Sequence, residues 1–579
     1  MNSNDATSSP ERIKLPGFGL PVNDLPEYPL KDRDVSKRQC FPNAITSWGA
    51  PNITVRERTM LAMINEITDK PDWDRKVNDK TIVSKWRNEA LGREGADISQ
   101  AMFDYCIAEL RDKAPHYAQT GRVIVLESEA AIVKSDTAIP PFLADELKAA
   151  VKPLEDVPER LKDWHPGSNE KVLDLVHPSL YPLMYGKSRV IPSGRCTLMD
   201  CLSRSVEGVI VRTPVQRHID LGPHNRFMVK CLPRVEARSA YNIKALNYWS
   251  GSYQWLPCEV AFRGEEQVEI TSYINNLHPR RHTALYRVLE KVVARTIPLW
   301  DGCLSYFGFD SARWRISTGG KGAQYECPLG KERPLDSDED PEDDDEWVRP
   351  SRVLLQPEPG EYKPYDQELR PEEGKTSYEG GAWHIEGQLN EHICASAIYY
   401  YEQESVTESR LAFRELTDGP RLDAEEDYEA GDYEGLERLY GVEQVGIGGY
   451  KRREVVGLPE CSTASSGAVW TCGPFKPGHR KILALFLVDP YLRMLSTANV
   501  APQQRDWWAE VVRQDDFTRL GRLPVELIDR VAGMMPPEDW PLSLEEAKKV
   551  REDLMVQRTV YTNKVNADYE QRGFSFCEH

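Results

Sequence analysis

The sequence predicts an α+β protein with a β-sandwich or jelly-roll core, and three observations lead to this fold class. Apolar residues at helical spacing occupy the region from Thr54 to Val151. Apolar runs typical of strands follow, and the strongest spans 480–488. Helical patterning returns after the capping box formed by Ser543 and Glu546. Helices on both sides of a strand-rich middle indicate α+β, but this pattern alone does not distinguish a jelly roll from another sandwich.

The first part of the chain, residues 1–170, is predicted to be a mainly helical module. Two sets of apolar residues recur there with the spacing of one helical face. They are Met60, Leu61, Ile64 and Ile67, followed by Phe103, Cys106, Ile107 and Leu110.

The middle of the chain, residues 171–500, is predicted to be a β-rich, jelly-roll-like core. Its expected strands lie at 254–262, 268–274, 393–401, 410–414 and 480–488. A helix is expected from about 282 to 295, with Pro298 limiting its end. We interpret the acidic run at 335–347 as a solvated loop and residues 501–579 as a C-terminal helical segment packed on the core.

Charge and cysteine usage restrict the possible partners and location. The formal net charge of -19 over 579 residues argues against binding to nucleic acid or to an anionic membrane surface. The 12 cysteines include no CxxC pair, and the polar N-terminus lacks an apolar signal region. We therefore expect reduced thiols and a cytoplasmic protein, or a nuclear one.

The tripeptide His384-Ile385-Glu386 is the most informative motif. On a strand, residues i and i+2 point to the same face, so the His384 imidazole and the Glu386 carboxylate would lie side by side. They would supply two of the three ligands of a 2-His-1-carboxylate site for non-haem Fe(II). The other interpretation is a partly buried polar pair that satisfies neighbouring strands.

Seven segments together resemble a fungal family known as domain of unknown function 4246. The resemblance extends from near Leu15 to the last residue, and its C-terminal half is similar to Fe(II)- and 2-oxoglutarate-dependent oxygenases. It therefore implies a double-stranded β-helix core. The segments are 176–186, 254–257, 272–279, 297–300, 383–387, 476–482 and 572–579.

The resemblance also implies roles for individual residues. His384 and Glu386 would hold Fe(II), and Arg480, at the start of the last strong strand, would pair with the distal carboxylate of 2-oxoglutarate. The other interpretation of Arg480 is an ordinary ion pair. The substrate to be hydroxylated would be a small molecule or a protein side chain.

The chain departs from the family pattern at the second metal histidine, because no histidine lies between His392 and His479. His479 is a candidate substitute ligand, although a surface histidine is the simpler interpretation. A second explanation concerns Cys461-Ser462-Thr463-Ala464-Ser465, because codons exist for which a frame shifted by two bases spells Leu-His-Arg-Val. We hypothesise a frame or splice-junction error within 457–473, which sequencing of the transcript would test.

The missing histidine also supports a different class of function. The alternative to an oxygenase is a non-catalytic interaction protein that retains the β-helix scaffold and binds partners through its helical flanks and acidic loop. The position of His384 and Glu386 relative to Arg480 would distinguish the two.

Overall fold

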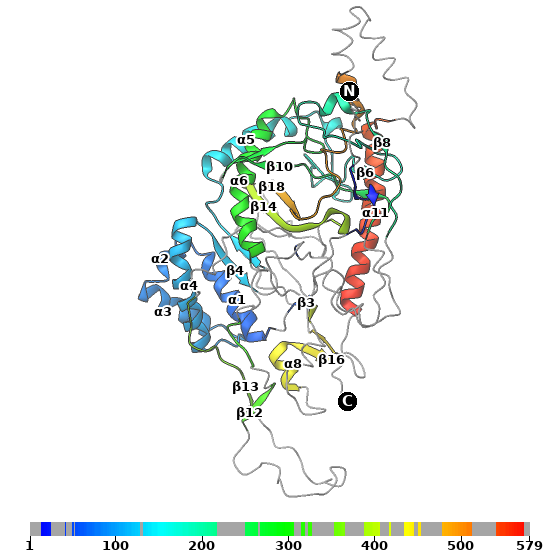
Figure 1. Ribbon diagram of the computed structural model, residues 1–579. Helices are drawn as coiled ribbons and strands as arrows, with labels where there is room; N and C mark the ends of the chain where they lie inside the picture. The colour runs from blue at the N-terminus through cyan, green and yellow to red at the C-terminus, as the bar shows by residue number, and fades with distance from the viewer. Residues whose placement is uncertain are drawn as a thin grey trace, which may run out of the picture.

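The computed structural model contains both helices and strands, in a mixed arrangement (Figure 1). The described residues are 13–24, 41, 49–50, 53–127, 131–216, 249–264, 267–305, 314–318, 322–326, 353–364, 387–405, 416–417, 434–444, 450–452, 478–511 and 540–571. Within them the α+β class is confirmed.

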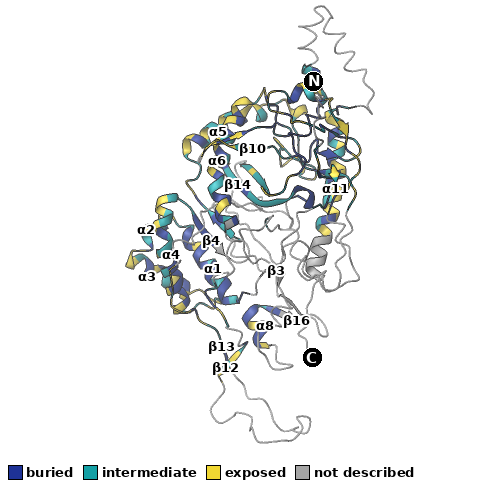
Figure 2. Cartoon of the chain, in the orientation of Figure 1, coloured by how far each residue is buried: buried dark blue, intermediate teal, exposed yellow. Residues whose placement is uncertain are grey.

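Among the described residues, four helices share a buried core in the N-terminal module, and three of them begin at a side-chain cap. Thr54, Asp79 and Ser99 each accept a backbone N–H of the first turn that follows. Both predicted apolar sets lie in the buried interior, and Figure 2 shows buried residues along α1 and α4. The helices are α1 (Val55–Thr68), α2 (Trp73–Lys76), α3 (Lys80–Leu91) and α4 (Gln100–Thr120).

A buried ion-pair network connects this module to a distant segment. The Arg315 guanidinium donates to the Glu57 carboxylate at 2.9 Å and to both oxygens of Glu109 at 2.7 and 2.8 Å. All three side chains are at most 2% exposed. Because unpaired buried charges are very unfavourable, each member depends on the others.

The two longest strands of the described residues form an antiparallel pair. β14 (Ile393–Glu404) pairs with β18 (His479–Val488), with Tyr399 opposite Leu483. Helices α5 (Pro141–Glu155) and α6 (Thr283–Ser305) pack against this pair through a shared apolar cluster. Figure 1 shows α6 alongside β14, and the predicted strand at 480–488 is confirmed.

The expected jelly roll is not seen in the described part of the chain, where every sheet has two strands. The predicted strand at 254–262 shows one reason. It divides into β9 (Tyr253–Gln254) and β10 (Val260–Phe262), because Pro257 lies between them and cannot donate a ladder hydrogen bond. The expected strand at 410–414 lies outside the described residues.

The other strands are short. They are β1 (Leu15–Pro16), β2 (Gly19–Leu20), β3 (Gly49–Ala50), β4 (Val123–Glu127), β5 (Ala131–Lys134), β6 (Leu183–Met184), β7 (Arg189–Val190), β8 (Val209–Ile210), β11 (Val268–Ile270), β12 (Gln324–Glu326), β13 (Val353–Leu355), β15 (Leu416–Thr417), β16 (Val442–Gln444) and β17 (Tyr450–Arg452).

Two helix ends test the sequence predictions. Helix α6 runs through Pro298 to Ser305, so the predicted end before this proline is wrong. A proline removes one N–H, and the helix tolerates that loss here. The capping box that precedes α11 (Leu544–Gln571) is confirmed, since Ser543 N donates to Glu546 Oε2 and Glu546 N donates to Ser543 Oγ.

The remaining helical segments are short. They are η2 (Glu159–Leu161), η3 (Cys201–Arg204), η9 (Leu389–Glu391) and α8 (Glu434–Tyr440). Among the described residues, no helix combines the length and apolar character needed to cross a membrane.

His278 holds the turn before α6, as its Asn-Leu-His-Pro context suggests. Its Nδ1 accepts from the backbone N–H groups of Arg280 and Arg281, at 3.3 and 3.2 Å. Its ring packs on Trp507, and its Nε2 lies 3.5 Å from Glu510. Burial lowers the pKa of His278 to about 4, and the Glu510 carboxylate opposes this shift.

Replacing Arg315 with methionine should destabilise the N-terminal module strongly, because Glu57 and Glu109 both lose the buried guanidinium, although Glu109 keeps Lys113 at 2.8 Å. We expect Arg315→Met to lower the free energy of unfolding by about 3–5 kcal/mol in urea denaturation. The control is Arg93→Met, which removes the exposed pair with Glu66 and should cost less than about 1 kcal/mol. Equal effects of the two substitutions would show that the buried network is not a stabilising centre.

Stability should also depend on pH through His278. A histidine whose folded pKa lies below 6.5 contributes stability above pH 6.5, and this contribution is lost as pH falls towards 4. His278→Asn keeps an acceptor for the turn but cannot gain a proton. The stability advantage of the wild type over this variant should therefore shrink by about 1–2 kcal/mol between pH 7.5 and pH 5, measured by urea denaturation. A constant advantage would contradict the assignment.

Candidate functional site

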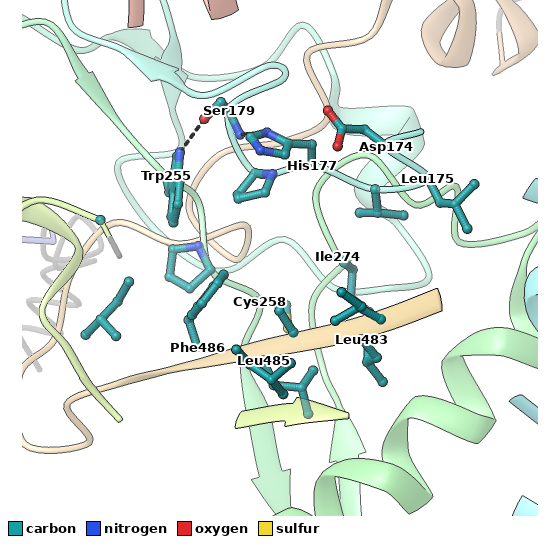
Figure 3. A pocket seen from close by; sticks show the side chains of 18 of the residues that line it. Asp174, Leu175, His177, Ser179, Trp255, Cys258, Ile274, Leu483, Leu485 and Phe486 are labelled. Atoms are coloured by element: carbon teal, nitrogen blue, oxygen red, sulfur yellow. Dashed lines mark hydrogen bonds between the residues drawn. The ribbon is translucent and has the colours of Figure 1, made fainter. Parts of the chain in front are cut away.

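A cavity of about 2470 Å³ lies beside β18. Its wall includes β18, the loop around 164–179, the segment 255–260 and one side of α11. Much of the lining is apolar, and polar and charged side chains line the rest of the cavity. Figure 3 shows this arrangement, with Asp174 and His177 on one loop and Leu483, Leu485 and Phe486 carried by β18.

A short hairpin-like loop places two polar residues together at the cavity. Trp164 and Leu173 form an isolated antiparallel bridge, and the chain turns between them through Pro166-Gly167-Ser168-Asn169. The backbone bonds His165 N–Val172 O and Asp174 N–Asp163 O, both 2.8 Å, hold the two sides. Because side chains alternate across such a pair, His165 and Asp174 reach the same face.

His165, Asp174 and His177 form a compact group. His165 Nδ1 lies 3.0 Å from Asp174 Oδ2, and the two imidazole centroids are 5.2 Å apart. One nitrogen or oxygen from each side chain lies within 4.8 Å of the others. The hydrogen bond to Asp174 raises the pKa of His165, whereas burial lowers the pKa of His177.

Basic residues of α11 balance the charge of this group. Arg551 pairs with both oxygens of Asp163, at 2.6 and 2.9 Å, and lies 3.6 Å from Asp174 Oδ2. Lys548 also pairs with Asp163, at 3.1 Å. The last helix is therefore attached to the loop through charge-assisted contacts.

Trp255 contacts three polar residues near the cavity: Ser179, Arg558 and Glu391. Its Nε1 donates to Ser179 Oγ at 2.9 Å, as Figure 3 shows. The Arg558 guanidinium lies 3.8 Å from the centroid of the Trp255 ring, a cation–π contact, and pairs with Glu391 at 2.7 Å. Glu391 also accepts a hydrogen bond from Trp255 N at 2.8 Å. Glu391, just before β14, therefore contacts both Trp255 and Arg558 of α11.

Gly387, the residue after His384-Ile385-Glu386 in the sequence, lines this cavity. His384 and Glu386 lie outside the described residues. Gly387 is described, lines the cavity, and has a φ of 75°, which favours glycine. A Cβ built on it would lie 2.8 Å from Ile393 Cδ1 and 3.3 Å from Glu391 Cβ.

Arg480 and His479 both line the cavity at the start of β18, but as successive strand residues they point to opposite faces. The Arg480 guanidinium lies 5.5 Å from the Tyr400 ring centroid. His479 is exposed, and its Nε2 and Nδ1 lie 2.7 Å from Glu402 and 3.9 Å from Glu404. The roles predicted for both residues stay predictions.

The group at His165, Asp174 and His177 was not predicted from the sequence. The available signal was a Pro-Gly-Ser-Asn turn between a histidine and a following Asp-x-x-His segment. Such a turn can bring its flanks together, but loop spacing alone does not give the register.

Two protein-family models match this chain. The model described as protein of unknown function (DUF4246) matches residues 100–373 and 365–511. The chain belongs to the DUF4246 family. A second model, domain of unknown function DUF4246, N-terminal, matches residues 15–89. Comparisons with curated proteins and with solved structures found no match.

The tight environment of Gly387 leads to a stability prediction for this DUF4246 protein. Gly387→Ala should lower the melting temperature more than Gly95→Ala does. Gly95 has a similar φ of 77°, but a Cβ there would meet nothing within 4 Å. The control thus measures backbone strain alone, about 1 kcal/mol, and the difference measures the contact with Ile393 and Glu391. Equal shifts in thermal denaturation would show that the wall is not tightly packed at Gly387.

Proposed function

We propose that this protein is an Fe(II)- and 2-oxoglutarate-dependent oxygenase that hydroxylates a substrate bound in the cavity. One observation carries the proposal: the same cavity is lined by Arg480 and by Gly387, the residue that follows His384-Ile385-Glu386. Gly387 and Arg480 thus line one cavity, although they are 93 residues apart in the chain.

The proposal assigns a separate task to each element. His384 and Glu386 would hold the iron. The bound iron would let O2 oxidise 2-oxoglutarate to succinate and CO2 and hydroxylate the substrate, so that each product takes one oxygen atom of O2. Arg480 would orient the distal carboxylate of 2-oxoglutarate. A guanidinium at an apolar cavity suits this task, because it can pair with a carboxylate in two parallel hydrogen bonds. The apolar side chains around it would exclude water from the bound substrate.

The third iron ligand would be His479 or a histidine encoded within 457–473. His479 pairs with Glu402, which also accepts from Lys481 at 2.7 Å. A ligand role would require His479 to leave these contacts. The other source of a histidine is the frame-error hypothesis, and residues 457–473 lie outside the described part of the chain.

The finer points of fold and location belong to the same proposal. β14 and β18 would be two strands of a double-stranded β-helix. The location would be cytoplasmic, which microscopy of the tagged protein would test.

The direct test is an anaerobic titration of the full chain with Fe(II) and 2-oxoglutarate. We expect a visible charge-transfer band that His384→Ala abolishes. Arg480→Gln should weaken 2-oxoglutarate binding at least about tenfold, the equivalent of about 1.4 kcal/mol, because the carboxylate loses its charged partner. The exposed Arg93→Met variant is the matched control and should titrate like the wild type.

The opposite results would reject the oxygenase. Absence of the band, or its persistence in His384→Ala, would leave the non-catalytic interaction protein as the better account. The sequence observation that favours this alternative is the lack of any histidine between His392 and His479.

A further inference from the structure

We propose that His165, Asp174 and His177 form a second metal site, which binds one divalent ion of the Zn²⁺ type and opens on the cavity. This site is separate from the iron site proposed at His384 and Glu386 and does not depend on it. His177 lies in segment 176–186 of the family resemblance, but no residue of the site belongs to His384-Ile385-Glu386 or to β18, to which the oxygenase proposal assigns cofactor binding.

The donor set has the chemistry of a transition-metal site. Two imidazoles and one carboxylate are typical ligands of Zn²⁺ sites that keep an open position, and the bonds are about 2.0–2.2 Å long. Tetrahedral ligands at that bond length lie about 3.4 Å apart. The ligand atoms of this group already lie within 4.8 Å of one another, so small side-chain rotations would bring them to an ion.

The backbone holds the three residues in place without an ion. The hairpin-like loop fixes His165 opposite Val172 and Asp174 opposite Asp163. The His177 carbonyl accepts from Asn276 Nδ2 at 2.9 Å, which attaches the third position to the turn before α6. A site whose ligands are held in advance loses little conformational entropy on binding.

The surroundings provide an open coordination position. All three residues line the cavity and are only partly buried. Three protein ligands facing a cavity leave the fourth position for water or for a bound molecule. The metal ion could therefore coordinate a molecule bound in the cavity through its fourth position.

Two neighbouring residues contact atoms that would bind the metal: Arg551 lies near Asp174, and the Ser179 N–H donates to His177. Arg551 is already paired with both oxygens of Asp163 and approaches Asp174 only to 3.6 Å, so it can remain as an outer partner of the ligating carboxylate. The Ser179 N–H donates to His177 Nδ1 at 3.2 Å. Binding through either nitrogen of His177 exchanges this long hydrogen bond for a metal–nitrogen bond, since Nε2 coordination needs a protonated Nδ1.

The test uses the full chain, stripped with a chelator and titrated with Co²⁺, whose visible spectrum reports its coordination, followed by competition with Zn²⁺. We expect the wild type to bind Co²⁺ at a site that Zn²⁺ then occupies. His165→Asn, Asp174→Asn and His177→Gln should each weaken that binding at least about tenfold. His282→Asn, a histidine at the start of α6 outside the group, is the control and should bind like the wild type.

The His384→Ala variant separates this proposal from the oxygenase. Retention of the Co²⁺ signal in His384→Ala, together with its loss in His165→Asn, supports a second site whether or not the oxygenase is correct. Loss of all Co²⁺ binding in His384→Ala, no binding by the wild type, or unchanged affinity in folded His165→Asn and His177→Gln would each overturn the proposal. Thermal denaturation of each variant identifies those that fold, and His177→Gln, which keeps an acceptor for Ser179, is the mildest of them.

Discussion

The pairing of β14 with β18 is the interaction on which the rest of the structure depends. It joins segments about 80 residues apart, and ten residue pairs fix its register from Ile393–Val488 to Glu404–His479. Side chains from this pair, including Tyr401, Leu483 and Leu485, contribute to the apolar cluster shared with α5 and α6. The same register brings Arg480 to the cavity and sets the position of Gly387 before β14. A slip by one residue would turn every side chain of β18 to the other face.

The cavity needs a second constraint, which α11 supplies through charge. Arg558 joins Trp255 and Glu391, and Arg551 joins Asp163 and Asp174. A third pair, Arg505 with Glu546 at 3.2 Å, fixes the start of the helix near the capping box. These partners are partly or fully buried, where a charge without its partner is costly, so the helix has one favourable position along the wall. The two proposed metal sites would then share one wall and one cavity.

The sequence predicted local features better than contacts between distant segments. The capping box at Ser543 and Glu546 and the strand at 480–488 follow from interactions within a few residues, and the structure confirms them. Pro298 was misinterpreted, because tertiary packing can maintain a helix past a proline. The strand pattern suggested a sandwich or jelly roll and the resemblance a double-stranded β-helix, but the described strands show only two-stranded sheets. The approach of Arg558 to Glu391 spans 167 residues, and no pattern in the sequence encodes it.

The central claim is that the cavity binds iron through His384 and Glu386 and 2-oxoglutarate through Arg480. A crystal structure of the full chain with 2-oxoglutarate, and with Mn²⁺ in place of iron, tests it most directly. Anomalous scattering would locate the Mn²⁺ ion. The account predicts an anomalous peak in the cavity, with His384 and Glu386 as ligands and a 2-oxoglutarate carboxylate paired with Arg480. Mn²⁺ bound elsewhere, or 2-oxoglutarate that makes no contact with Arg480, would contradict it.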